Sequence, residues 1–327
     1  ISFIIMYLCI IKGIRSTGKV AYITAPAPYF FLFIFLIRGM FLDGAWEGIK
    51  FLFAVDWSKI WNLSIWGQAA GQVLFQVSTG VGALIMFSSY KQKSESISHP
   101  SLVVPGITVL TGLLCALTVF TYMGYMAKTT GVPIQELPLS GPDLVFVAYP
   151  AALTLLPLSN FWSVMFFVML FFLGVDTEFA LLETVCSHLE DEKIEFFNKP
   201  LPMEIKRLIM TVILFIGGIF LYTKGGFYLL PFYDTYVVNV PMMLVCMLEC
   251  WIVAWVYGWD RLGAQIQKYT NEVVPAYIVI STKFIAIPVL FLLAAGALIE
   301  ELYDLFSYPW FMGLIGLCLL GSPISQI

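Results

Sequence analysis

Long apolar segments separated by short polar loops dominate the chain. Nine such segments can be traced, near residues 1–12, 20–37, 67–90, 101–127, 161–187, 205–222, 237–257, 277–299 and 308–325. Most of them reach the ~20 residues that a helix needs to cross a bilayer. The pattern therefore predicts an all-α polytopic membrane protein with about nine transmembrane helices, one of them broken.

The broken helix is expected in the segment Gly71–Tyr90. This segment is apolar enough to span a bilayer, but glycines and polar residues interrupt it: Gly71, Gln76, Ser78, Thr79, Gly80 and Gly82. One interpretation is a packing face, because small residues let membrane helices approach closely. The other is an unwound helix whose freed backbone groups line a cavity, as at the binding sites of transporters. Taken alone, the segment does not decide between them.

Composition and charge narrow the class of protein. Of the 327 residues, 60% are hydrophobic and 12% charged, and the mean hydropathy is +0.90, whereas soluble domains carry about 25% charged residues. The net charge of −4 is small, so we expect a lipid bilayer and no nucleic acid as partner. All six cysteines lie in apolar segments, where free cysteine is a small hydrophobe, and we expect neither disulfides nor a cysteine metal site.

Basic residues mark one set of loops. Twelve of the 17 Lys and Arg fall in or beside alternate loops, starting with the loop after residue 12, whereas the last loop, around Glu300, Glu301 and Asp304, is purely acidic. The positive-inside rule makes the basic loops cytoplasmic. The outer loop 128–160 carries an apolar, proline-punctuated run that is too short to span. It could be a re-entrant, lid-like element or a plain helix packed on the bundle.

Two segments carry candidate functional positions. The 20–37 segment follows Gly18 and contains Pro26 and Pro28; because proline removes a backbone donor, this helix should be kinked or able to open at its cytoplasmic end. Asp234 sits at the outer end of another helix, where it could be a gate or a helix-start charge.

Three acids, Asp176, Glu178 and Glu183, lie well inside the 161–187 segment. Acids within a membrane helix are costly and usually face a cavity or a partner. Asp176 and Glu183 share a helix face within about 20°. With the Thr177 hydroxyl, Asp176 offers the hard oxygen ligands that an alkali cation accepts. The alternative for each acid is a partner on a neighbouring helix.

Eight motifs, in order, closely resemble the neurotransmitter:sodium symporter family, which has the LeuT-type fold. They are GIRSTGKVAYITAPAPY (13–29), DWSKIW (56–61), GQVLFQVSTGVGALIMFSSY (71–90), GYMA (124–127), GPDLVFVAYPAALT (141–154), FWSVMFFVMLFFLGVDTEFALLETV (161–185), GGFYLLPFYDTY (225–236) and AWVYG (254–258). Because Ile1 is not a start methionine and an apolar segment begins at once, we expect 1–327 to be a single transporter domain running from the fourth to the twelfth transmembrane helix, with the first three as missing partners.

The resemblance implies roles for individual residues. It implies a substrate pocket lined by Phe75, Ser78, Thr79, Gly80, Val81, Thr177 and Glu178, with Glu178 and Val81 departing from the usual residues. It implies a second sodium site at the Leu173 carbonyl, Asp176 and Thr177, and an outer gate at Asp234. Gly18 and Pro28 match an element whose unwinding accompanies cytoplasmic sodium release.

The first sodium site and the chloride site depart from the family. Gln76 stands where the family has Ser or Thr, and Thr108 where it has Asn, so the first sodium site is degenerate. Of the visible chloride positions only Gln72 is retained, and Gly112 replaces a Ser. Sodium is therefore the expected coupling ion, and ordinary chloride dependence is doubtful.

The resemblance implies sodium-coupled symport of an amino acid or small amine across the plasma membrane by alternating access. The alternative is a transport-inactive orphan member that binds a ligand or partner without flux. We expect no enzymatic activity, because the two histidines, His99 and His188, lie in or near the loops predicted to be cytoplasmic and belong to no nucleophile constellation.

Overall fold

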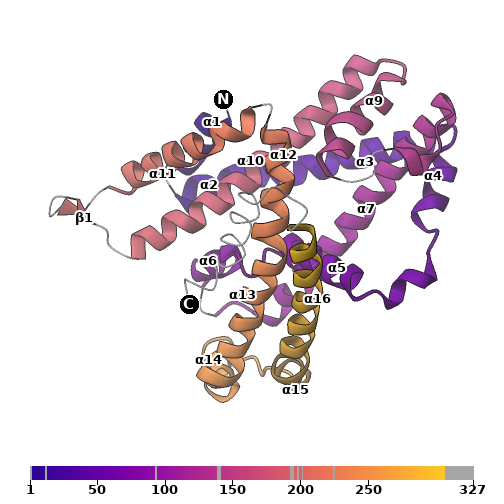
Figure 1. The fold of residues 1–327 in the computed structure, drawn as a ribbon. Coiled ribbons are helices and arrows are strands. Elements are labelled where there is room, and N and C mark those ends of the chain that lie inside the picture. Colours follow the sequence, from indigo (N-terminus) through magenta and orange to yellow (C-terminus); the bar gives the residue numbers. More distant parts are fainter. Residues whose placement is uncertain are drawn as a thin grey trace. The chain divides into compact units, whose positions relative to one another are not determined.

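Figure 1 shows the computed structural model of the chain, which describes residues 2–11, 13–92, 94–137, 141–191, 195–196, 199–200, 202–223 and 225–305. The chain divides into two compact units. Unit 1 comprises Ile1–Val55 and Val109–Ile219, and unit 2 comprises Asp56–Thr108 and Phe220–Ile327. Each unit is built from segments that are distant in sequence, and each is described by itself.

Unit 1 is helical apart from one short strand pair. Its elements are α1 (Ser2–Ile10), α2 (Ile14–Thr24), α3 (Pro26–Met40), α4 (Ala45–Leu52), the part of α7 (Ser98–Thr130) from Val109 onward, η2 (Ile134–Glu136), α8 (Gly141–Asp143), η3 (Leu144–Ala148), α9 (Tyr149–Thr154), α10 (Ser159–Asp191), β1 (Glu195–Phe196), β2 (Lys199–Pro200) and α11 (Met203–Gly218). Strands β1 and β2 pair antiparallel.

Unit 2 contains the broken segment and the C-terminal helices. Its elements are η1 (Trp57–Trp61), α5 (Leu63–Val77), α6 (Ala83–Ser89), the start of α7, α12 (Gly226–Tyr233), η5 (Asp234–Asn239), α13 (Val240–Trp251), η6 (Ile252–Gly258), α14 (Trp259–Thr270), α15 (Ala276–Ile280), η7 (Ser281–Ala286) and α16 (Ile287–Leu305). The short helix η4 (Ile219–Tyr222) lies at the boundary of the two units.

The all-α membrane architecture is confirmed. Within the described residues, six helical stretches are long and apolar enough to cross a membrane: Gly18–Met40, Ser98–Thr130, Ser159–Glu190, Met203–Tyr222, Leu229–Thr270 and Ala276–Tyr303. The predicted segment 67–90 is divided between α5 and α6, and segment 1–12 contains the nine-residue α1. The predicted segment 308–325 lies outside the described residues.

Proline determines where several of these helices change their hydrogen-bond register. The π-helical segments η3, η5 and η7 end at residues 148, 239 and 286, each two residues before a proline: Pro150, Pro241 and Pro288. A proline has no N–H to donate to the carbonyl four residues earlier. The wider i→i+5 pattern, which is most often a single-turn insertion in an α-helix, accommodates the missing donor without ending the helix.

An aromatic cluster forms the core of unit 1. Phe35 of α3 makes ring contacts with Tyr122, Tyr149, Trp162 and Phe166, and the Tyr122 hydroxyl donates to the Phe35 carbonyl at 3.1 Å. Rings in such edge-on arrangements stabilise a core beyond the area that they bury. Tyr149 brings α9 into this core, so the structure supports the packed-helix interpretation for the described part of loop 128–160.

The segment that contains Pro26 and Pro28 is helical on both sides of Ala25. Ala25, between α2 and α3, has right-handed helical φ and ψ of −75° and −43°, and its N–H donates to the Ala21 carbonyl at 3.0 Å. Pro26 opens α3, where its missing N–H removes only one ladder bond. The segment that the sequence predicts to be openable is therefore closed in this structure.

Candidate substrate and ion sites

The helix break predicted within Gly71–Tyr90 lies between α5 and α6. Ser78, Gly80 and Gly82 have positive φ values of 58°, 73° and 83°. Left-handed backbone costs glycine nothing but is uncommon for other residues, and three such residues within five positions end one helix and start another. The broken-helix interpretation is confirmed. The small residues also permit close packing, because a Cβ on Gly71 would lie 2.1 Å from the Asn239 Oδ1.

The break is held by local hydrogen bonds and by α13. The Ser78 and Thr79 amides donate to the carbonyls of Phe75 and Leu74 at 3.0 and 3.1 Å, which satisfies the end of α5. A Cβ on Gly80 would lie 2.9 Å from the Cys246 sulfur. Only glycine allows the unwound backbone to pass this close to α13.

The predicted substrate residues fall into two groups. Unit 2 brings together Phe75, Ser78, Thr79, Gly80 and Val81, all at the break. Thr177 and Glu178 lie on α10 of unit 1, so the predicted set is divided between the units. Glu178 has one carboxylate oxygen that is buried without a hydrogen-bond partner among the described residues.

The proposed second sodium site lies on one turn of α10. The Thr177 hydroxyl donates to the Leu173 carbonyl at 3.0 Å, so two of the three predicted ligands already contact each other. The third, Asp176, accepts a 2.6 Å hydrogen bond from the Thr24 hydroxyl. Thr24 is 6% exposed, and its hydroxyl also lies 3.2 Å from the Val20 carbonyl.

Sequence reasoning did not single out Thr24. Its position between Gly18 and Pro28, on the helix predicted to open, is the sequence feature that could have pointed to it. In the structure Gly18 is exposed, with no atom within 4 Å of where its Cβ would be, whereas Pro28 is buried. The Thr24 hydroxyl thus links the potentially openable helix to the predicted sodium ligand Asp176.

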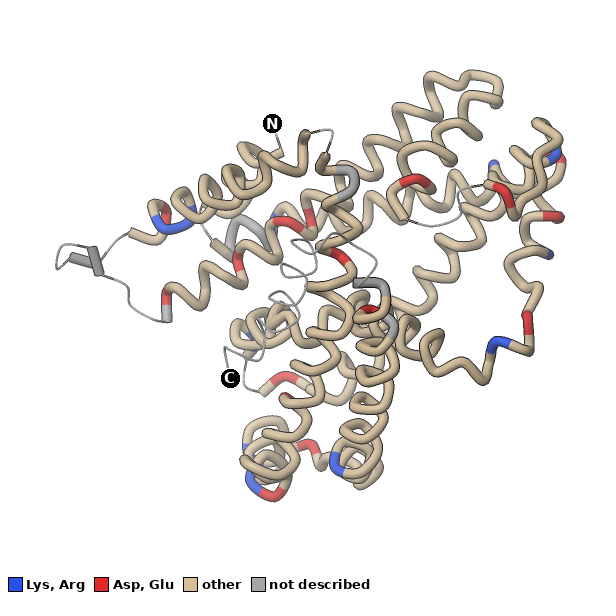
Figure 2. The backbone as a smooth tube through the Cα atoms, in the orientation of Figure 1, with Lys and Arg blue, Asp and Glu red and all other residues tan. Residues whose placement is uncertain are grey.

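Glu183 forms an ion pair with Arg207 of α11. The Arg207 guanidinium contacts the two Glu183 carboxylate oxygens at 3.1 and 3.3 Å, and the side chains are 8% and 1% exposed. The partner alternative therefore holds for Glu183. Counting basic residues placed Arg207 in a loop, but it lies in α11 and is buried. Figure 2 shows such charged positions against long uncharged stretches of helix.

The predicted first sodium site and chloride site offer few ligands in the described structure. Gln72 and Gln76 are one turn apart on α5, and Gln76 is exposed. The Thr108 hydroxyl donates to the Val104 carbonyl of its own helix at 2.9 Å.

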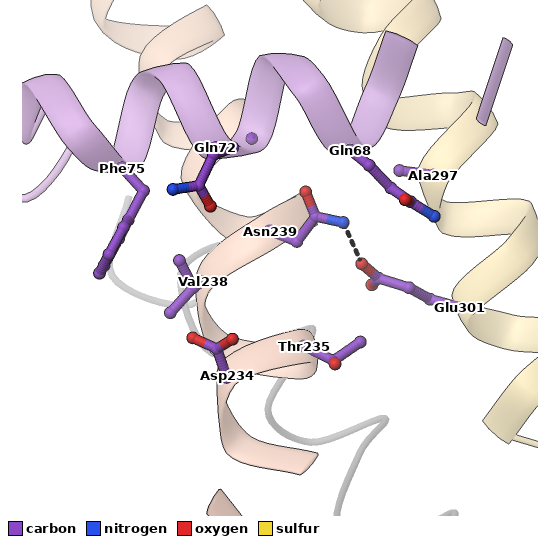
Figure 3. Close-up of a pocket in the computed structure, with 10 residues that line it drawn as sticks. Gln68, Gln72, Phe75, Asp234, Thr235, Val238, Asn239, Ala297 and Glu301 are labelled. Atoms are coloured by element: carbon purple, nitrogen blue, oxygen red, sulfur yellow. Dashed lines mark hydrogen bonds between the residues drawn. The ribbon is translucent and has the colours of Figure 1, made fainter. Parts of the chain in front are cut away.

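A pocket of about 370 Å³ lies within unit 2 beside Asp234, the predicted outer gate. Figure 3 shows its lining, which α5, η5 and α16 supply: Gln68, Gly71, Gln72, Phe75, Asp234, Thr235, Val238, Asn239, Ala297 and Glu301. The Asn239 amide donates to Glu301 Oε1 at 2.8 Å, and Glu301 is 5% exposed.

The pocket corrects one prediction from the sequence. Glu301 was assigned to an acidic outer loop, but it lies in α16 and is buried. Sequence reasoning also missed Asn239. Its neighbour Pro241 was a signal, because proline disturbs the helix register on which face assignments depend.

Glu272, between α14 and α15, is hydrogen-bonded to the start of α7. Glu272 accepts hydrogen bonds from the Ile97 and Ser98 amides at 3.1 and 3.0 Å and from the Ser98 hydroxyl at 2.8 Å, at the start of α7. Hydrogen bonds from the serine side chains at 96 and 98 and from these backbone amides lower the pKa of Glu272 to about 2.

The whole chain, residues 1–327, matches the family described as the sodium:neurotransmitter symporter family. It is 37% identical over 249 residues to the sodium- and chloride-dependent glycine transporter 2 of Xenopus laevis, covering 76% of this chain and 31% of the relative. It is 36% identical over 248 residues to glycine transporter 1 of the same organism, covering 75% of this chain and 38% of the relative. The chain thus spans about a third of these relatives' length, and it belongs to the sodium:neurotransmitter symporter family of multi-pass integral membrane proteins.

Proposed function

We propose that the protein is a secondary transporter that couples sodium to the symport of an amino acid or related small amine by alternating access. The broken helix α5–α6 carries the proposal, since unwound backbone at membrane depth is tolerated only where protein or a cavity surrounds it. Because the two relatives are glycine transporters, glycine is the first substrate to test. The proposed location is the plasma membrane.

Substrate would bind at the break. We assign Phe75, Ser78, Thr79, Gly80 and Val81 to the substrate site in unit 2, and we keep Thr177 and Glu178 of α10 as predicted substrate residues in unit 1. One Glu178 oxygen has no hydrogen-bond partner among the described residues, which supports a cationic group on the substrate, because a membrane-embedded carboxylate is stabilised by a cation.

Sodium would bind at the Leu173 carbonyl, Asp176 and Thr177. Hard oxygen ligands of this kind suit an alkali cation. The Thr24 hydroxyl would hydrogen-bond to the Asp176 carboxylate after sodium leaves. Because Thr24 lies between Gly18 and Pro28, this bond would couple ion release to the opening of the helix that carries these residues. Asp234 would act as the outer gate.

Chloride dependence and the first sodium site would differ from those of the relatives. Gln76 has an amide where the family has a hydroxyl, Thr108 has a hydroxyl where it has an amide, and Gly112 has no side chain where it has a hydroxyl. Gln72 is the remnant of the anion site. In flux assays, replacing chloride by gluconate should change uptake little. The double substitution Gln76→Ser and Thr108→Asn should increase the chloride dependence, and its failure to do so would count against this assignment.

Radiolabelled uptake by the full protein tests the proposal. Glycine, other amino acids and small amines would be compared in sodium and in potassium medium, with Asp176→Asn as the inactive control and surface expression measured for each variant. Sodium-dependent uptake abolished by Asp176→Asn is the expected result. A well-expressed protein that binds a ligand but shows no flux would favour the alternative, a transport-inactive member that acts through binding.

A further inference from the structure

We propose that Ser96, in the loop before α7, is a phosphorylation site for a basophilic serine kinase, and that the phosphate releases Glu272 from the start of α7. The inference rests on the exposure of Ser96, on the lysines that precede it in the sequence and on the hydrogen bonds that join its loop to Glu272 within unit 2. It concerns neither the substrate nor the ion positions, and it does not depend on transport.

Ser96 is accessible and follows basic residues. It is exposed and lies outside regular secondary structure, two residues before α7 begins at Ser98. In the sequence, Lys93 precedes it by three positions and the apolar Ile97 follows it. Kinases select substrates partly by charge pattern, and this spacing is typical of substrates of basophilic kinases. The positive-inside rule assigns this loop to the cytoplasm, where ATP and such kinases are found.

The Ser96 side chain takes part in the contact between this loop and the loop that joins α14 to α15. It hydrogen-bonds to the Glu272 carboxylate, which also accepts from the Ile97 and Ser98 amides at 3.1 and 3.0 Å. These bonds lower the pKa of Glu272 to about 2, so the carboxylate is charged at neutral pH. The hydroxyl that the kinase would modify therefore lies beside a negative charge.

A phosphate on Ser96 is incompatible with this contact. Phosphorylation removes the hydroxyl proton that Ser96 donates to the carboxylate, and it adds a charge of about −1.5 to −2. Because like charges at hydrogen-bonding distance repel each other, the Glu272 loop should leave the start of α7. The two loops are then no longer joined by this carboxylate.

The start of α7 can accept the phosphate in place of the carboxylate. The His99 amide already donates to Ser96 Oγ at 3.4 Å, and helix N-termini favour anions. Lys91 is also close, because its Nζ donates to the Ser96 carbonyl at 2.5 Å and lies 3.7 Å from a Glu95 oxygen. The phosphate would thus gain amide donors and a cation while Glu272 loses its partners.

The modification is a phosphoryl transfer from ATP. Ser96 Oγ forms a bond to the γ-phosphorus, the bond between that phosphorus and the bridging β-phosphate oxygen breaks, and ADP leaves. The catalytic aspartate of the kinase accepts the hydroxyl proton.

The first test asks whether Ser96 is modified. The purified full protein is incubated with MgATP and the catalytic subunit of cAMP-dependent protein kinase, which is basophilic, and mass spectrometry locates the phosphate. We expect phosphate on Ser96 and its loss in Ser96→Ala. Ser94→Ala is the matched control, because Ser94 is also exposed and also follows a lysine by three positions, but Glu95 comes after it. No phosphate on Ser96, or phosphate on Ser94 alone, would overturn the assignment.

The second test asks whether the phosphate releases Glu272. Charged spin labels are attached at Val273→Cys and His99→Cys, two exposed positions next to the contact, with the unsubstituted protein as the labelling background. Phosphorylation should lengthen the distance between the labels and broaden its distribution, and a phosphatase should reverse both changes. A distance that phosphorylation leaves unchanged would overturn the proposed release.

Glu272→Gln in the same labelled protein is the matched control. Its side-chain amide has no charge to repel the phosphate, so phosphorylation should change the distance less than it does with Glu272 present. An equal change in the glutamine variant would overturn the role of the carboxylate. The comparison before and after phosphorylation needs no substitution at Glu272, so it decides the proposal even if Glu272→Gln fails to fold.

Discussion

Glu183 in unit 1 and Glu301 in unit 2 are both buried carboxylates on largely apolar helices, with 1% and 5% of their surface exposed. Glu183 is paired with the Arg207 guanidinium through two contacts. Glu301 is oriented by the neutral Asn239 amide and faces a cavity. The two acids therefore have similar burial and different described partners, a guanidinium for Glu183 and an amide for Glu301.

The difference separates two ways of holding a buried carboxylate in an apolar helix. An ion pair satisfies a buried carboxylate internally, and removing one partner leaves an uncompensated charge. An amide partner orients the carboxylate through a hydrogen bond. A buried acid in a membrane helix is thus better interpreted through the charge of its partner than through its burial.

Breaking the ion pair should have the largest effect. Arg207→Met leaves Glu183 buried without a cation, which should destabilise the protein by about 3–5 kcal/mol. Thermal unfolding of the purified full protein measures this loss. The double variant Glu183→Leu with Arg207→Met should regain most of the stability, because it leaves no buried charge. A single variant as stable as the parent would show that Arg207 is not a structural partner.

Removing the amide donor to Glu301 should have a smaller effect. Asn239→Leu removes the hydrogen bond to Glu301 Oε1, which should destabilise the protein by about 1–3 kcal/mol, the loss typical of a hydrogen bond to a charged group. Thermal unfolding of the purified full protein measures it, with Asn239→Gln as the control that keeps the amide. A leucine variant as stable as the parent would show that Asn239 does not hold the Glu301 carboxylate.

Asp176 is an intermediate case, because its described partner is the neutral hydroxyl of Thr24. Thr24→Val keeps the shape and removes this donor. We expect the sodium concentration for half-maximal uptake to change by roughly 3- to 10-fold, which corresponds to the lower range for a hydrogen bond to a charged group. Sodium titration of uptake measures the change, and Thr24→Ser should behave like the parent. If uptake by the valine variant depends on sodium concentration as in the parent, Thr24 does not affect the ion site.

Glu272 extends the comparison to a half-buried acid outside the membrane helices and should have the smallest effect. Its pKa is lowered from 4.5 to about 2 by hydrogen bonds to the folded start of α7. This stabilisation is complete above the unfolded pKa and is lost as pH falls through 4.5 toward 2. Hydrogen exchange of the Ile97 and Ser98 amides should therefore show the same protection factors at pH 7 and pH 6.

Glu272→Gln should lower those protection factors locally while the melting temperature stays close to the parent value, since local opening can occur without global unfolding. Protection at Ile97 and Ser98 that is unchanged in the variant would mean that the carboxylate does not hold the start of α7.

The sequence predicted the features that depend on backbone chemistry. The membrane helices followed from hydropathy, which is a local signal. The break at Ser78–Gly82 was one of two interpretations of the glycines and polar residues in an apolar segment, and the family resemblance favoured it.

The partners of the buried acids could not be predicted in the same way. Arg207 is close to a basic loop in sequence, and Glu301 is close to an acidic one, so charge counting assigned both to loops. Their burial depends on which helices pack together, which one sequence does not specify. Thr24 and Asp176 are 152 positions apart, and nothing in the local pattern joins them.

The π segment before Pro241 suggests how this family could remodel a binding surface in one step. Inserting one residue into a helix turns everything beyond it by about 100°. In unit 2 that turn lies between Asp234 and Asn239, the two ends of η5. Gain or loss of a single residue in this segment would therefore turn a whole helix face at once, so that ligand preference would evolve through changes of helix phase as well as through exchange of individual side chains.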